Sequence, residues 1–171
     1  MKVLAISGSA SPLSSNFYLL QAISGLWKEK AKVSLVEGLA DFKMFSPQAL
    51  EVGVPEEIQH IKNQITNADL LLIATPEYSH NIPACLKNLL EWCTASGEFH
   101  QKKVIPITFT PNVSRGKFAM QSLLMSLKSM KAQLLTQIPL YKTDVEIRHQ
   151  QIILPEEIKT MLNEALHLAG G

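Results

Sequence analysis

The sequence predicts an α/β protein in which a five-stranded parallel sheet is covered by helices on both faces. Strand and helix patterns alternate from one end of the 171 residues to the other, and the first and third strands are apolar throughout. A chain of this length is enough for one domain with a substantial core. We therefore expect a single domain over residues 1–171.

The five strands are expected at residues 2–7, 32–37, 69–75, 104–109 and 132–138. Helical spacing of apolar residues predicts the intervening helices at 16–30, from about 55, at 82–93, 116–130 and 155–168. The second and fifth strands carry polar residues, such as Ser34 and Gln133, which edge strands tolerate. The apolar first and third strands are then central, which indicates the flavodoxin-like order 2-1-3-4-5 in a three-layer sandwich.

Pro106 does not fit this order easily, because the fourth strand is internal and proline cannot donate a hydrogen bond to a neighbouring strand. A bulge, or a strand that pairs late, would accommodate it.

The composition argues against several classes of partner. Sixteen basic residues nearly balance fifteen acidic ones, so the basic face that nucleic acid or an anionic membrane requires is not expected. No apolar run is long enough for a signal segment or a membrane span, which predicts a cytoplasmic protein. Cys85 and Cys93 are eight residues apart on one helix, about 12 Å at helical rise, so we expect two reduced thiols. No metal-ligand spacing is present.

The first of three polar loops, residues 8–16 (GSASPLSSN), joins the first strand to the first helix. Gly8 permits a sharp turn, the serines are hydroxyl donors, and the helix N-terminus adds free N–H groups. A phosphate fits such a cradle. The alternative is a serine-rich turn with Ser15 or Asn16 as the helix N-cap, which needs no ligand.

The second loop, residues 76–83 (PEYSHNIP), follows the third strand, where the strand order reverses and ligands of open parallel sheets bind. Its aromatic ring, backbone donors and two prolines could line a flat heteroaromatic ring. A rigid turn, with Tyr78 packed for stability and Asn81 as a cap, is the alternative. His80 alone is a weak indicator, and no G-x-S-x-G motif supports hydrolysis. The third loop, residues 110–116, places Thr110 at the same edge.

These loops resemble the NADPH-dependent FMN reductase family, which includes quinone, azo-dye and chromate reductases. The family motif Gly-Ser-x-Arg-x-x-Ser-x-Asn is matched by Gly8, Ser9, Ser14 and Asn16. The second motif begins Pro-Glu-Tyr and is matched by Pro76, Glu77, Tyr78, Pro83, Leu86, Lys87, Asn88, Glu91 and Trp92. Four positions depart from these motifs: Ser11 replaces an arginine, Ser79 an asparagine, Asn81 a serine and Ala84 a glycine.

The resemblance implies that the first loop holds the FMN phosphate and that the second follows the isoalloxazine ring. It assigns cofactor binding to Ser9, Ser11, Ser14, Ser15, Asn16, Pro76, Glu77, Tyr78, Ser79 and Thr110. Because Ser11 lacks a charge, Arg115 or Lys117 would have to reach across to the phosphate. The resemblance also implies a homodimer or a dimer of dimers, with Trp92 and Cys93 near the interface. A position of Trp92 in the core is the alternative.

The implied activity is transfer of a hydride from NADPH or NADH to bound FMN, and then of electrons to a small acceptor such as a quinone, an azo compound or free flavin. The flavin supplies this chemistry, so no side chain is assigned as a catalytic acid or base. An electron carrier that reacts only with proteins, or a nucleotide-binding module without flavin, remains open as an alternative.

Overall fold

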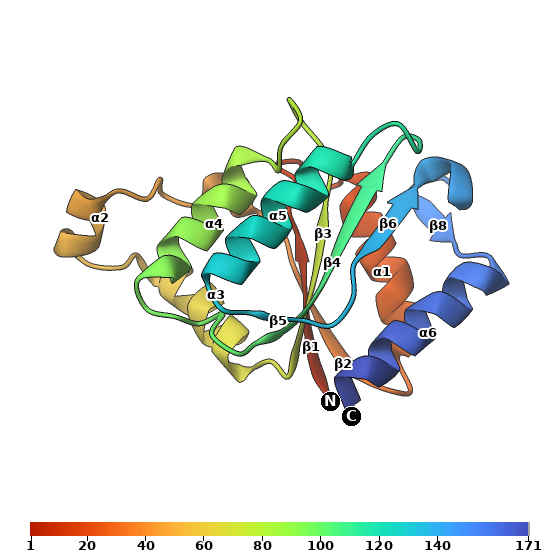
Figure 1. The fold of residues 1–171 in the computed structure, drawn as a ribbon, viewed down its shortest axis with the longest axis horizontal. Helices are drawn as coiled ribbons and strands as arrows, with labels where there is room; N and C mark the ends of the chain where they lie inside the picture. Colours follow the sequence, from red (N-terminus) through yellow and green to blue (C-terminus); the bar gives the residue numbers. More distant parts are fainter. Residues whose placement is uncertain (171) are drawn as a thin grey trace.

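A parallel sheet of order β2-β1-β3-β4-β5, with β6 also paired to β4, forms the centre of the computed structural model (Figure 1). The structure describes residues 1–170, so of the predicted domain only Gly171 lies outside the described residues. The predicted strand order is confirmed. The strands of the sheet are β1 (Lys2–Ser7), β2 (Lys32–Val36), β3 (Leu70–Thr75), β4 (Lys103–Thr110), β5 (Gln133–Leu134) and β6 (Ile138–Tyr141).

Helices cover both faces of the sheet, which confirms the predicted three layers (Figure 1). Because side chains alternate along a strand, Val3 and Ala5 pack on one side, against α1 and α6, and Leu4 and Ile6 on the other, against α3 and its neighbours. Every residue of β3 is buried, as expected for a central strand. The helices are α1 (Ser15–Trp27), α2 (Pro47–Val52), α3 (Glu56–Asn67), α4 (Ala84–Thr94), α5 (Lys117–Ser129) and α6 (Glu156–Gly170).

The predicted fifth strand is two short strands, β5 and β6, with an extra residue between them. Leu134 pairs with Val104, and Ile138 pairs with Ile107. The chain therefore advances by four residues from β5 to β6 while β4 advances by three. Val104 O accepts the N–H of Leu135. Pro106 lies two residues further along β4, so its backbone faces the same neighbouring strand. Because Pro106 has no N–H to donate there, the ladder is interrupted, and the expected bulge is confirmed.

Two segments contain short elements that were not expected from the sequence. The segment before α3 contains the short helix α2, where the Ser46 hydroxyl accepts the N–H of Ala49. After β6 lie a 3₁₀ turn (Lys142–Asp144) and a hairpin of β7 (Glu146–Arg148) and β8 (Gln151–Ile153). Both are too short for periodicity to distinguish them from loops.

Of the two positions considered for Trp92, the structure shows the core, while its place near a subunit interface stays a prediction. The side chain is fully buried, its Nε1 donates to Lys43 O at 2.8 Å, and its ring packs edge-on against Phe45. Both cysteines are free, as expected. Burial raises the pKa of Cys93 to about 12, so its sulfur stays a thiol. None of the helices within residues 1–170 is long and apolar enough to cross a bilayer.

Candidate functional site

The three polar loops meet at the carboxyl edge of the sheet and enclose a cavity of about 350 Å³. We call it the carboxyl-edge cavity. It lies within the size range of small-molecule sites. Nine of the ten predicted residues line it: Ser9, Ser11, Ser14, Ser15, Asn16, Pro76, Glu77, Tyr78 and Thr110. Ser79 instead lines an adjoining cavity of about 290 Å³.

The N-cap of α1 is Ser14, one residue before the two positions considered from the sequence. Its Oγ accepts the N–H of Phe17 at 3.1 Å, and its carbonyl accepts that of Tyr18. The N–H groups of Ser15 and Asn16, in the first turn, have no helical acceptor, and both residues line the cavity. This is an anion-binding arrangement, because the helix dipole also places a partial positive charge at this end.

Asn16 leaves a buried polar atom without a partner. The residue is 2% exposed, and its Nδ2 donates to Phe109 O at 3.4 Å. Its Oδ1 has no hydrogen-bond partner among the described residues. A buried acceptor without a donor is destabilising, so the oxygen is suited to a ligand that brings an O–H or N–H group.

Gly8 is required for close packing rather than for the sharp turn expected from the sequence. Its φ is not in the positive region, but a Cβ there would lie 2.7 Å from Leu86 Cδ2 and 3.2 Å from Ala74 O. Absence of a side chain therefore lets the loop lie directly against β3 and α4.

The carboxylate of Glu77 caps helix α5. Glu77 Oε2 accepts the N–H groups of Phe118 and Ala119, each at 3.0 Å. Burial alone would raise the pKa of Glu77, but the backbone N–H groups of Ala119, Gly116 and Phe118 outweigh it and hold the pKa below its usual value. The carboxylate thus fastens the second loop to α5, across 41 residues of sequence.

Residues 78–81 form a tight turn at the rim of the carboxyl-edge cavity. Tyr78 and Asn81 exchange two backbone hydrogen bonds of 2.9 Å, while Ser79 and His80 have φ values of 50° and 58°. Two consecutive positive φ values are typical of a type I′ turn, in which asparagine and glycine are preferred. Each non-glycine residue there costs about 1–3 kcal/mol. Asn81 Oδ1 also accepts the hydroxyl of Ser122 at 2.6 Å.

Two cations, Arg115 and Lys142, line the carboxyl-edge cavity. Arg115 therefore lines the same cavity as the first loop, whereas Lys117 lines a different groove beside α5. Lys142 was missed, because it follows β6, whose position depended on the bulge opposite Pro106. With Glu77 bound to α5, these cations and the start of α1 favour an anionic ligand.

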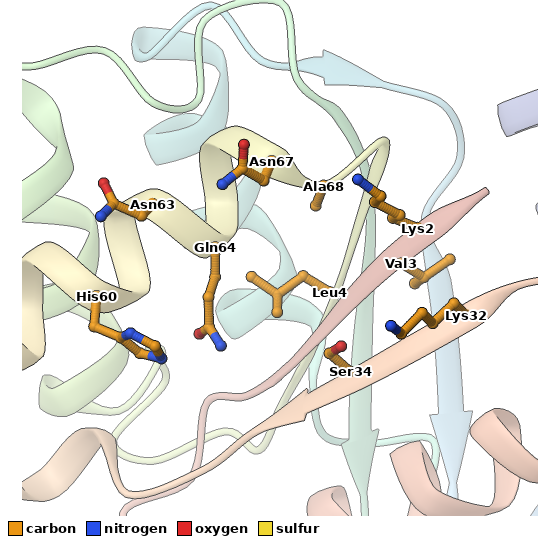
Figure 2. A pocket seen from close by; sticks show the side chains of 10 residues that line it. All are labelled: Lys2, Val3, Leu4, Lys32, Ser34, His60, Asn63, Gln64, Asn67 and Ala68. Carbon is orange, nitrogen blue, oxygen red and sulfur yellow. The ribbon is translucent and has the colours of Figure 1, made fainter.

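A second cavity, of about 320 Å³, lies at the opposite edge of the sheet, where β1 and β2 begin. Figure 2 shows that α3 contributes His60, Asn63 and Gln64 to this amino-edge cavity. Its cations are Lys2 and Lys32. No group of three metal-ligating side chains occurs there or elsewhere in residues 1–170.

Comparison with known proteins identifies a family and agrees with this fold. The family model of NADPH-dependent FMN reductases matches residues 1–142. NADH:(hydroxy)cinnamate reductase subunit CrdA of Vibrio ruber is 39% identical over 98 residues, which are 57% of this chain and 48% of that protein. NADH-dependent flavin reductase subunit 2 of Lactobacillus johnsonii is 37% identical over 92 residues, 54% of this chain and 48% of that protein. The chain thus spans about half the length of these curated relatives.

Among solved structures, the flavoenzyme NAD(P)H:(acceptor) oxidoreductase FerB from Paracoccus denitrificans superposes with a TM-score of 0.83 at 19% identity, covering 99% of this chain and 95% of that one. At this identity the similarity shows the fold. The family assignment comes from the match over residues 1–142, within which lie all the cavity-lining residues described above. The chain belongs to the NADPH-dependent FMN reductase family.

Proposed function

We propose that the carboxyl-edge cavity binds FMN and that the chain is an NAD(P)H-dependent oxidoreductase. One observation carries the proposal: the open N–H groups of α1, Arg115 and Lys142 line the same cavity as the aromatic ring of Tyr78. A phosphate group and a flat ring system are the two ends of FMN. The family match supports the same ligand.

The phosphate is assigned to Ser9, Ser11, Ser14 and Ser15, with the backbone of Asn16. Ser9 Oγ accepts the N–H of Ser11 at 3.2 Å, and its own hydrogen remains to be donated. The Oδ1 of Asn16 needs a donor, which a phosphate dianion lacks. We therefore assign this atom to a hydroxyl of the ribityl chain, which refines the role expected for Asn16.

The isoalloxazine ring is assigned to the second and third loops, at Pro76, Glu77, Tyr78, Ser79 and Thr110. Thr110 Oγ1 donates to Arg115 O at 3.2 Å, so it also holds the third loop in place. Glu77 acts through its cap on α5, which fixes the second loop relative to the third. Rigid positioning of this kind is what the reaction needs from the protein.

The redox chemistry is that of the flavin, which takes a hydride from NADPH or NADH and returns electrons to a small acceptor such as a quinone, an azo compound or free flavin. The protein positions both substrates and excludes water from the ring.

We propose further that the enzyme is a cytoplasmic homodimer or dimer of dimers. The two free cysteines are typical of a reducing compartment. Four exposed apolar side chains lie in the loops around the site and at the start of α5, and could be covered by a second copy: Leu13, Tyr78, Val113 and Phe118. Sedimentation of the flavin-loaded protein at several concentrations tests the assembly.

The function is tested by adding FMN to the purified protein and then NADPH or NADH without oxygen. We expect a yellow complex whose flavin absorbance is bleached, and steady-state quinone reduction without any protein partner. Failure to take up FMN would favour a module without flavin. Uptake of FMN without nicotinamide oxidation would favour an electron carrier.

A further inference from the structure

The cavity of about 290 Å³ beside the proposed flavin site is lined only by Glu77, Ser79, His80, Ser114 and Arg115. We call it the acceptor cavity. It shares Glu77 and Arg115 with the carboxyl-edge cavity, so the two adjoin. Every residue that lines it is polar or charged, and none of the roles assigned above uses His80.

Two side-chain contacts and the backbone conformation restrain His80, whose side chain is 77% exposed. Its Nδ1 lies 3.8 Å from Glu77 Oε1, and its ring packs edge-on against Phe118 with 4.7 Å between centroids. Its backbone is fixed in the type I′ turn, at a φ of 58°. Since Nδ1 faces the carboxylate of Glu77, the other ring nitrogen, Nε2, is free to donate to a ligand.

The turn itself indicates that the His80 side chain has a use. The second central position of a type I′ turn favours glycine, which adopts positive φ without strain. A histidine there carries a conformational cost, and such strain is often found at functional sites. His80 lies three residues after Glu77 in the second loop. Arg115 comes from the third loop and lines the same cavity.

We propose that His80 and Arg115 bind the oxygen of the electron acceptor, and that His80 is a catalytic residue that protonates it. The inference rests on the proposed function. It assigns as substrates the electron acceptors that become oxyanions on reduction, above all quinones. Reduction of a quinone to a hydroquinone takes two electrons and two protons. A hydride, derived from the reduced nicotinamide, brings both electrons and one proton.

The remaining quinone oxygen is then an oxyanion. The Nε2–H bond of the imidazolium breaks and an O–H bond forms, which gives the hydroquinone and neutral His80; the imidazole then regains a proton from water. Arg115 stabilises the oxyanion by its charge. Glu77 and Arg115 are the charged groups that share the acceptor cavity with His80.

The test compares His80→Gln with the matched control His60→Gln, which changes an exposed histidine in the amino-edge cavity (Figure 2). Oxidation of the reduced flavin-loaded enzyme is followed with a quinone and with ferricyanide, which takes single electrons and needs no proton. We expect His80→Gln to slow quinone reduction at least tenfold and to leave ferricyanide reduction within twofold. The decline of the quinone rate with rising pH should also disappear, while His60→Gln matches the parent protein.

A wild-type quinone rate and pH profile in His80→Gln would overturn the proposal, as would an equal loss with both acceptors, which indicates a purely structural role. A second arm measures binding of salicylate, a redox-inert aromatic anion, by calorimetry. We expect His80→Gln and Arg115→Gln each to weaken it about fivefold or more, and unchanged binding in both contradicts the proposal. The salicylate measurement does not depend on flavin turnover. Failure of the proposed reductase function would therefore be seen separately, as failure to oxidise NADPH or NADH.

Discussion

The two edges of the sheet carry cavities of similar size, about 350 Å³ at the carboxyl edge and about 320 Å³ at the amino edge. The two edges differ in whether their polar groups have hydrogen-bond partners. At the amino edge the carbonyls at the end of α3 are occupied, because Lys102 Nζ donates to Thr66 O and to Ala68 O. At the carboxyl edge Asn16 Oδ1 has no such partner among the described residues, and the N–H groups of Ser15 and Asn16 have no helical acceptor. Unmet hydrogen-bonding capacity, rather than volume, distinguishes the candidate site.

The largest effect is expected from removing the carboxylate that holds the carboxyl edge together. Glu77→Ala leaves two N–H groups at the start of α5 without their charged acceptor, which should lower the free energy of unfolding by about 2–4 kcal/mol. Flavin binding should weaken with it, since the second loop is no longer fixed to α5. Chemical denaturation and FMN titration measure the two effects, and an unchanged unfolding midpoint would contradict the cap.

The same carboxylate gives the protein a stability that depends on pH. Because the folded state lowers the pKa of Glu77 from its usual 4.5, the contribution is complete above that value and is lost as pH falls below it. Glu77→Gln should therefore reduce the loss of stability that occurs as pH falls below about 4.5. Denaturation at a series of pH values compares the variant with the parent protein, and parallel curves for the two would argue against this role.

Replacing Ser11 by arginine tests how much a charged side chain at the carboxyl edge adds to phosphate binding. Arginine can pair with a phosphate through two charged hydrogen bonds, where serine offers one neutral hydroxyl. The gain over serine is about 1–2 kcal/mol, or five- to thirtyfold in affinity. Because Arg115 and Lys142 already line the cavity, we expect about fivefold for FMN and little change for riboflavin. If Ser11→Arg tightens both ligands equally, the loop does not hold the phosphate.

A smaller effect is expected in the turn at the rim. Asparagine adopts positive φ several times more readily than serine, so Ser79→Asn should stabilise the fold by about 0.5 kcal/mol. The melting temperature should rise slightly. A matched change outside the turn, Ser129→Asn near the end of α5, gives the baseline, and a drop in stability specific to Ser79→Asn would show that the turn is not strained at this position.

The smallest effect is expected at the amino edge. Lys32→Gln removes a cation from that cavity, and FMN affinity should stay within about twofold of the parent protein, because exposed charges far from a ligand are screened. A loss comparable to that of Arg115→Gln, measured by the same FMN titration, would mean that the amino edge binds the flavin.

The sequence predicted most of this geometry, because it depends on local patterns. Apolar strands separated by amphipathic helices specify the order 2-1-3-4-5, and the carboxyl ends of neighbouring parallel strands then have to meet. Even the irregularity opposite Pro106 could be anticipated, since proline lacks the N–H that an internal strand needs.

What could not be predicted depends on contacts between distant residues. The Glu77 cap joins groups 41 residues apart, and Lys142 reaches the cavity only because the chain after the bulge turns back towards α1. Gly8 is needed for the approach of Leu86, which no turn pattern reveals. The core position of Trp92 could not be selected from the sequence, because an aromatic residue at the end of a helix is compatible with both an interface and a core.

The central claim, that the start of α1 holds the phosphate of FMN in a cavity lined by two cations, is tested most directly by titrating flavin-free protein with FMN and with riboflavin at low and high ionic strength. Charged hydrogen bonds to a phosphate should make FMN bind at least about tenfold more tightly than riboflavin at low salt. That difference should narrow as salt screens the phosphate. Equal affinities for the two flavins at every salt concentration would contradict the account.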